Sequence, residues 1–223
     1  MEVRIPVSAW RRTIAWLVGR LARLHYGYEV PFVDTIVRQH GWRAACRRLA
    51  ALGRTLTRIE QRFGERDGHL LLAFSAVWHG CLACAVGHVR AANLAHFHLT
   101  GELSPLDESM LPDLLGVRDS GAHTRFSALC TGGQIGSLGE LLARQSALHD
   151  GTLAVVSDED ELLRSSLDAY DGSDRSPLAA RTAVTIPRLS HRARDLDLCG
   201  RYELARRRER LTTGPLPTTA RAP

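Results

Sequence analysis

The residues best suited to chemistry lie in one short stretch, 79–88, which reads HGCLACAVGH. Cys81 and Cys84 are three residues apart, and His88 follows Cys84 by four residues. On a helix, residues three and four apart are neighbours whose Cβ atoms lie about 5–6 Å from each other. If this stretch is helical, two thiols and one imidazole therefore share a single face.

This arrangement suits reversible thiol oxidation. A helical separation of three places two Cα atoms within the ~4.4–6.8 Å that a disulfide accepts. The attacking species is the thiolate, and a free cysteine has a pKa of about 8.5, so the thiol needs help to ionise at neutral pH. A helix start, which Gly80 places near Cys81, and an imidazole one turn beyond Cys84 both favour the thiolate. A second thiol within reach also captures a sulfenic acid as a disulfide before further oxidation.

Other interpretations of the same residues stay open. Two cysteines on a buried helix can be small core residues, and Cys81, Cys84 and His88 can equally be three zinc ligands. The candidates for a fourth ligand are His79, His96 and His98. Because no second CxxC or HxxxH pair completes a standard structural site, we expect no metal. Ala85 follows the second cysteine, which excludes a c-type haem motif.

Two consecutive apolar segments must position these side chains. Residues 70–78 (LLLAFSAVW) are nearly all apolar and rich in Ala and Leu, which predicts a buried helix rather than a strand. His79 and Gly80 interrupt it. A second helix, CLACAVGHVRAANLAHF, is predicted to begin at or near Cys81.

Upstream, apolar residues at three- and four-residue steps predict more helices. Residues 1–30 form an amphipathic helix that either lies on a membrane surface or packs on the core with its Arg residues in solvent, and we expect the second. A helix from Pro31 to Gly41 follows, and then a longer one through residues 42–63. Cys46 falls on the apolar face of the longer helix and is expected to be buried.

The pattern is weaker beyond residue 100. We predict a helix that starts near Ser104 and is limited by Pro112, then a loop over 120–136, a helix over 139–148 and a short strand over 152–156. A further helix is capped by Ser157 and runs to about Tyr170. A linker over 172–177, a charged helix over 201–210 and a disordered tail over 211–223 complete the prediction. No regular alternation of strands and helices is present, so we expect a mainly α fold.

The bulk composition narrows the class of protein. The chain has 223 residues, of which 44% are hydrophobic and 24% charged, as in ordinary globular domains. No apolar run approaches the ~18 residues of a membrane span, and no signal-peptide cleavage site is evident, so we expect a cytoplasmic protein. All 29 basic residues are Arg, which indicates coding bias, so the net charge of +5 does not lead us to expect nucleic acid as a partner. Five cysteines without a secretory signal argue against a disulfide scaffold.

The motif resembles that of a known family. The pattern CxxCxxxH followed by small residues, here CLACAVGHVRAA, on the second of two buried helices is similar to that of the alkylhydroperoxidase D / carboxymuconolactone decarboxylase superfamily. The resemblance is specific over residues 81–92 and extends loosely back to Pro31. It implies an AhpD-like helical bundle over residues 31–150. The flanking parts are then an N-terminal helix (1–30), a C-terminal helical extension (151–210) and a tail (211–223).

The resemblance also implies an activity. Its dithiol members are thiol-dependent peroxidases, in which Cys84 would attack a peroxide or small disulfide, Cys81 would resolve the intermediate and His88 would belong to a proton relay. An external thiol or lipoyl-type reductant would restore the dithiol, with no bound cofactor, in a homo-oligomer. Decarboxylase and lactonase-like members do not need a dithiol, so the intact pair favours the redox branch. The alternative is a non-catalytic helical assembly protein or zinc-linked sensor on the same fold.

Two positions depart from the family pattern. The family relay includes a glutamate about a dozen residues before the first cysteine, where this sequence has His69. Histidine titrates near neutral pH and can pass a proton, so His69 is a fourth candidate catalytic residue, unless it merely begins its helix. Ala83 stands where the peroxidases often carry His. His123 as a lid residue and Cys130 as a third redox thiol are weaker candidates in the predicted 120–136 loop.

Overall fold

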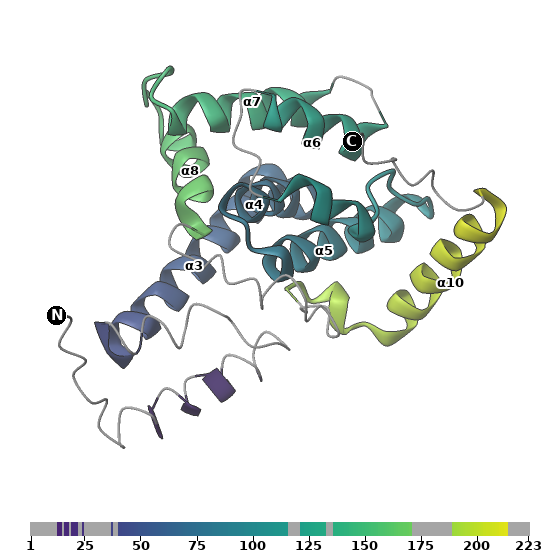
Figure 1. Ribbon diagram of the computed structural model, residues 1–223, viewed down its shortest axis with the longest axis horizontal. Helices are drawn as coiled ribbons and strands as arrows, with labels where there is room; N and C mark the ends of the chain where they lie inside the picture. Colours follow the sequence, from purple (N-terminus) through teal and green to yellow (C-terminus); the bar gives the residue numbers. More distant parts are fainter. Residues whose placement is uncertain are drawn as a thin grey trace, which may run out of the picture.

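The structure, a computed structural model (Figure 1), describes residues 40–115, 121–132, 136–170 and 189–213, together with single positions between 13 and 37. Every regular element in these ranges is a helix, which confirms the mainly α prediction for this part of the chain. The elements are α3 (Trp42–Phe63), α4 (Glu65–His79), α5 (Leu82–Thr100), η1 (Glu108–Leu114), α6 (Ala122–Thr131), α7 (Ser137–His149), α8 (Asp158–Leu167), η2 (Asp168–Tyr170), η3 (Arg192–Arg194) and α10 (Leu196–Thr213).

Helices α4 and α5 form the central hairpin, around which the others pack (Figure 1). Both predicted buried helices are confirmed, since α4 is buried from Gly68 to His79 and most of α5 is buried as far as Ala95. Gly80 joins them with a left-handed φ of 80°, a conformation that a side chain would strain. The N–H of Cys81 donates to the carbonyl of Ala76, which closes the end of α4 and sets α5 running back along it.

Helix α8 belongs to the same core as α4 and α5. Leu162, Leu163, Leu167 and Tyr170 are buried in one cluster with the apolar residues of the hairpin. The predicted cap is confirmed, because the hydroxyl of Ser157 accepts a hydrogen bond from the backbone N–H of Asp160 in the first turn of α8.

Two predictions for the middle of the chain are wrong. Most of the predicted 120–136 loop is helix α6, whose Phe126 and Cys130, four residues apart, are buried against the core. Gly, Ser and Thr around this short apolar stripe concealed it. The predicted strand over 152–156 does not form, since these residues are exposed and have no partner strand among the described residues. The helix predicted over 139–148 is confirmed as α7.

Helix α3 has the predicted extent, but Cys46 is exposed rather than buried. Among the described residues, α3 packs against the main cluster from its middle onward, through Leu52, Leu56, Ile59 and Phe63. The residue buried near the start of the helix is Ala45, one position before the cysteine. An apolar stripe identifies a face, but it does not show how far along the helix that face is covered.

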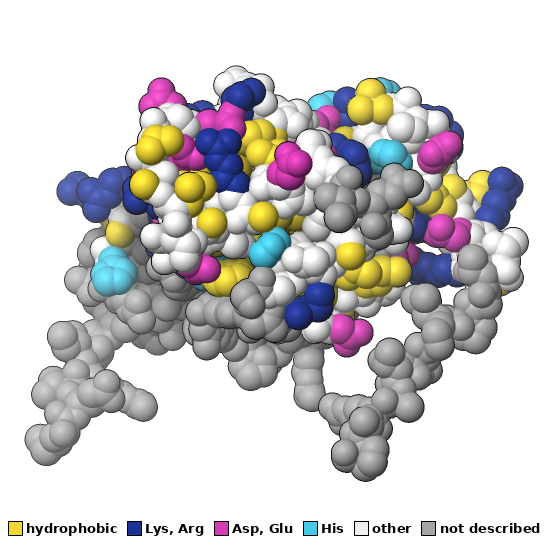
Figure 2. All heavy atoms as spheres, turned by 90° about the horizontal axis from the view of Figure 1, so that it is seen from above, with side chains coloured by type: hydrophobic (Ala, Val, Ile, Leu, Met, Phe, Trp, Pro, Cys, Tyr) yellow, Lys and Arg dark blue, Asp and Glu magenta, His cyan; other side chains and the backbone are white. Residues whose placement is uncertain are grey.

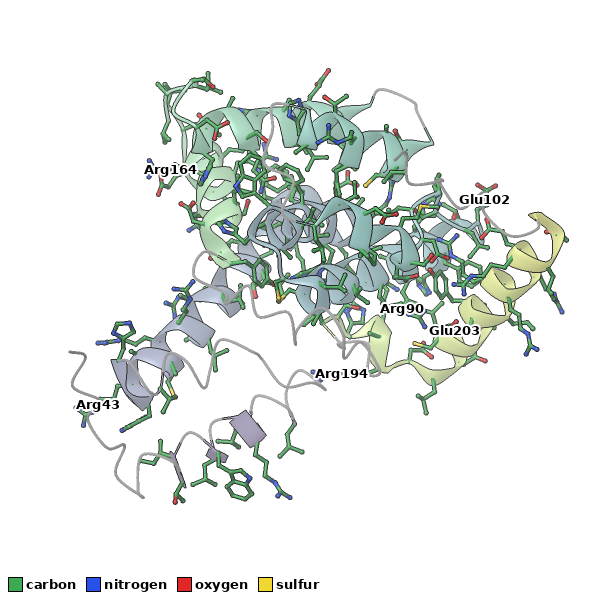
Figure 3. All side chains as sticks on the ribbon, in the orientation of Figure 1. Arg43, Arg90, Glu102, Arg164, Arg194 and Glu203 are labelled. Carbon is green, nitrogen blue, oxygen red and sulfur yellow. A yellow bond between two sulfur atoms is a disulfide. The ribbon has the colours of Figure 1, made fainter. Side chains whose placement is uncertain are left out.

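In the C-terminal part, the structure differs from the sequence-based prediction in two details. The helix expected to start near Ser104 begins after Asp107, whose side chain accepts from the N–H of Ser109, and Pro112 lies inside the resulting 3-10 helix. Helix α10 extends past the predicted 201–210 at both ends and includes 211–213, which the sequence assigned to a disordered tail. Figure 3 shows Arg90 of α5 and Glu203 of α10 facing each other, and their charged groups lie 2.5 Å apart.

The rest of the expected organisation lies at or beyond the described ranges. Leu17, Leu21 and Leu24 of the predicted N-terminal helix are helical and exposed, so the expected packing of this stripe on the core does not occur at these positions. Most of the predicted helix over 31–41, the linker over 172–177 and residues 214–223 lie outside the described residues.

No described helix is both long and apolar enough to cross a bilayer. Figure 2 shows basic side chains interspersed with acidic ones on the face it presents.

Candidate functional site

The site is built at the start of α5. Cys81 is the N-cap residue, and Cys84 lies in the first turn. The two are joined as a disulfide, with their Cα atoms 5.4 Å apart, as the helical spacing predicts. Cys84 is fully buried and Cys81 is 3% exposed, while the flanking Gly80 and Ala83 are partly exposed. Residues on both sides of Cys81 and Cys84 in the sequence thus reach the surface at the α4–α5 turn.

The helix start also favours a thiolate. The first backbone N–H groups of a helix have no partner within it, and together with the helix dipole they place partial positive charge at this end. Cys81 and Cys84 lie at this end of α5. When the disulfide is reduced, this position stabilises a negative charge on either sulfur.

His88 lies one turn beyond Cys84 and is 2% exposed. Burial, with a smaller contribution from neighbouring His69, lowers its pKa well below the usual value, so the ring is neutral. Both ring nitrogens are engaged: Nδ1 lies 2.8 Å from Nδ1 of His69, and Nε2 lies 2.5 Å from the hydroxyl of Tyr170. His69 thus joins the predicted site, together with a tyrosine that the sequence did not suggest.

His69 connects this pair to the surface. It is fully buried, and its Nε2 lies 3.1 Å from Oε1 of Glu60, whose side chain is 33% exposed. The geometry does not meet that of a hydrogen bond, so the contact is an ion-pair distance. The connected groups are, in order, Tyr170, His88, His69 and Glu60.

Hydrogen-bond roles along this series follow from the carboxylate, which only accepts when ionised. The tautomer of His69 that carries its proton on Nε2 directs that proton toward Glu60. Its Nδ1 then accepts from Nδ1–H of His88, and Nε2 of His88 accepts from the hydroxyl of Tyr170. One consistent direction of donation therefore runs from Tyr170 to His69, and Glu60 lies at ion-pair distance beyond it.

Helix α4 holds Tyr170 in place through the end of α8. The carbonyl oxygen of Leu167 accepts from the hydroxyl of Ser75 at 2.6 Å and from Nε2 of His79 at 2.9 Å. The last carbonyls of a helix lack partners within it, so these two side chains fix the C-terminal turn of α8. Tyr170 follows three residues later in η2 and is thereby directed at His88.

Comparisons with protein-family models, curated proteins and solved structures found no match to this chain. The function must therefore be inferred from the geometry of the site.

The weaker candidates do not join the site. Cys130 is buried on α6, and burial raises its pKa far above the usual value, which argues against a third redox thiol. His123 is a partly exposed residue of the same helix rather than a loop residue.

Glu60 and Tyr170 are the two members of the site that sequence reasoning missed. They come from α3 and η2, and no local spacing links them to the cysteine motif.

The proposed zinc ligands are not assembled either. His79 binds the carbonyl of Leu167, and His96 and His98 lie about 12–15 Å further along α5 than His88. Within the described ranges, no three side chains of His, Cys, Asp or Glu are grouped so as to hold a metal ion.

Proposed function

We propose that this protein is a thiol-dependent peroxidase of the alkylhydroperoxidase type, with Cys84 as the attacking thiol and Cys81 as the resolving one. One observation carries the proposal: two cysteines at disulfide distance lie at the start of α5, followed within the next turn by a buried, neutral His88 that is hydrogen-bonded to His69. A dithiol with an adjacent base is the arrangement that thiol oxidation requires. The resemblance of the motif to that superfamily adds to it.

The reaction takes two steps from the dithiol. The Cys84 thiolate attacks one oxygen of the peroxide, the O–O bond breaks, and the departing alkoxide takes a proton to give the alcohol and a Cys84 sulfenic acid. The Cys81 thiol then attacks the Cys84 sulfur, an S–S bond forms, and the hydroxide leaves with the remaining thiol proton as water. The two thiols together supply the two electrons that reduce the peroxide.

Reduction starts from the disulfide seen in the structure. An external thiol or lipoyl-type dithiol attacks Cys81, the slightly more exposed of the two cysteines, and releases the Cys84 thiolate. A second thiol from the reductant then frees Cys81. We place this cycle in the cytoplasm, where such reductants are kept reduced, and expect a homo-oligomer, which light scattering on the purified protein will test.

Thiol titration tests the proposal directly. The fully reduced chain has five cysteines, and the structure leaves three of them outside the disulfide. Stoichiometric peroxide should therefore remove two thiols per chain, and a thiol or lipoyl-type reductant should restore them. Peroxide consumption by the Cys84→Ser protein should fall to the background rate.

Cys46→Ser is the matched control, because it removes an exposed cysteine on α3 that lies outside the site. It should reduce the titrated total by one and leave the peroxide-sensitive pair intact. Retention of all thiols by the wild-type protein, in peroxide and in a small disulfide, would refute the proposed function. So would equal reactivity of the wild-type and Cys84→Ser proteins.

A further inference from the structure

We infer that the site contains a proton path that leads from the attacking thiol to solvent. Its members, from the inside outward, are Cys84, Tyr170, His88, His69 and Glu60. The inference rests on the proposed function, because it describes how the attacking thiol of that reaction loses and regains its proton. It assigns Tyr170 as the group next to the thiol and Glu60 as the exit.

The inner end follows from the two occupied nitrogens of His88. Its Nδ1 is bonded to His69 and its Nε2 to the hydroxyl of Tyr170. In the path that we infer, the proton of Cys84, one helical turn away, enters through one of these partners. Since His69 leads outward to Glu60, the hydroxyl of Tyr170 is the inner partner.

The outer end follows from burial. Tyr170, His88 and His69 are each no more than 2% exposed, whereas the side chain of Glu60 is 33% exposed. Glu60 alone among these four groups exchanges protons readily with water. Its carboxylate on α3 is thus the member that connects the interior of the hairpin to the surface.

The path moves a proton without leaving a charge on a buried ring. The thiol proton passes to the oxygen of Tyr170, and the hydroxyl proton of Tyr170 passes to Nε2 of His88. Nδ1–H of His88 passes its proton to Nδ1 of His69, and Nε2–H of His69 passes its proton to Glu60. The net change is a Cys84 thiolate and a neutral Glu60 carboxylic acid, with each ring left neutral in its other tautomer. The reverse sequence returns the proton to the alkoxide product.

A pH jump measures this transfer without any oxidant. In a Cys81→Ser background, Cys84 remains a thiol, and its ultraviolet thiolate absorbance after a jump from about pH 6 to about pH 9 gives the deprotonation rate. Cys84→Ser in the same background supplies the baseline. We expect both Glu60→Gln and Tyr170→Phe to slow deprotonation by about tenfold to a hundredfold, the usual contribution of a positioned acid or base.

Chemical rescue distinguishes the two ends. Formate in the buffer should restore the rate of Glu60→Gln, because the missing carboxylate lies at the surface, and should leave Tyr170→Phe slow, because that break is internal. A residue with only a structural role would not respond to formate. Glu161→Gln, an exposed carboxylate on α8 paired with Arg164, is the matched control and should keep the parent rate.

Parent rates in both Glu60→Gln and Tyr170→Phe would overturn the path. If Tyr170→Phe does not fold, as judged by circular dichroism, Glu60→Gln decides alone: a slow rate that formate restores supports the path, and any other result refutes it. Failure of the proposed function is a separate outcome. The proposed function fails if the wild-type protein keeps all its thiols in peroxide, whatever the pH-jump rates show.

Discussion

The double hydrogen bond to the Leu167 carbonyl predicts a measurable coupling between two residues of α4. In Ser75→Ala, the carbonyl keeps its bond from His79, so we expect only the net worth of one hydrogen bond, about 1 kcal/mol of unfolding free energy. In His79→Leu it keeps the bond from Ser75, and the loss is again about 1 kcal/mol plus any change in packing. In the double variant the buried carbonyl loses both bonds, which adds about 1–3 kcal/mol.

The two substitutions should therefore be more than additive, by about 1–3 kcal/mol, and packing effects of the single changes cancel in this coupling energy. Urea unfolding followed by circular dichroism, with unchanged denaturant slopes, measures it. Ser165→Ala is the matched control, because its hydroxyl donates to the carbonyl of Leu162 within α8 and its loss should add to His79→Leu without coupling. Additivity of Ser75→Ala and His79→Leu would refute the claim that they jointly fix the end of α8.

Three further predictions concern other parts of the molecule. Cys130 should resist alkylation in the folded protein, because burial raises its pKa, while exposed Cys46 reacts readily; mass spectrometry of the labelled peptides will show the order. Because His88 is held neutral with a pKa below that of the unfolded chain, the unfolded state binds more protons below about pH 6.5. Unfolding free energy should then fall by about 1 kcal/mol between about pH 6 and about pH 5, a slope that His88→Gln removes in parallel urea titrations. Arg206→Met should cost about 3 kcal/mol in the same assay, because its buried guanidinium binds two backbone carbonyls, while Arg201→Met, at an exposed pair, should cost about 0.5 kcal/mol or less.

The features that the sequence predicted well are governed by short-range spacing. The hairpin of α4 and α5, its Gly80 turn and the shared face of Cys81, Cys84 and His88 all follow from apolar runs and from three- and four-residue steps. Such steps depend only on the geometry of one helix. That is why the arrangement of these side chains could be predicted without knowing what packs around them.

The features that were missed depend on contacts between distant segments. Tyr170 reaches His88 across 82 residues of sequence, and Glu60 approaches His69 from a different helix. No periodicity encodes either contact, since both depend on how α3 and α8 pack on α4. The exposure of Cys46 has the same origin, because neighbours beyond its own helix decide which part of an apolar stripe is covered.

Burial of Cys84 and the proposed proton path require each other. Removing a thiol from water raises its pKa, so a buried cysteine loses reactivity unless other groups stabilise or generate the thiolate. The helix start stabilises the charge, but it gives the proton no way out of a fully buried site. A protonated imidazole there would place a second charge in the core, which burial of His88 already disfavours. A series of neutral groups that ends at a partly exposed carboxylate resolves this conflict, because the proton leaves while every fully buried ring keeps zero charge.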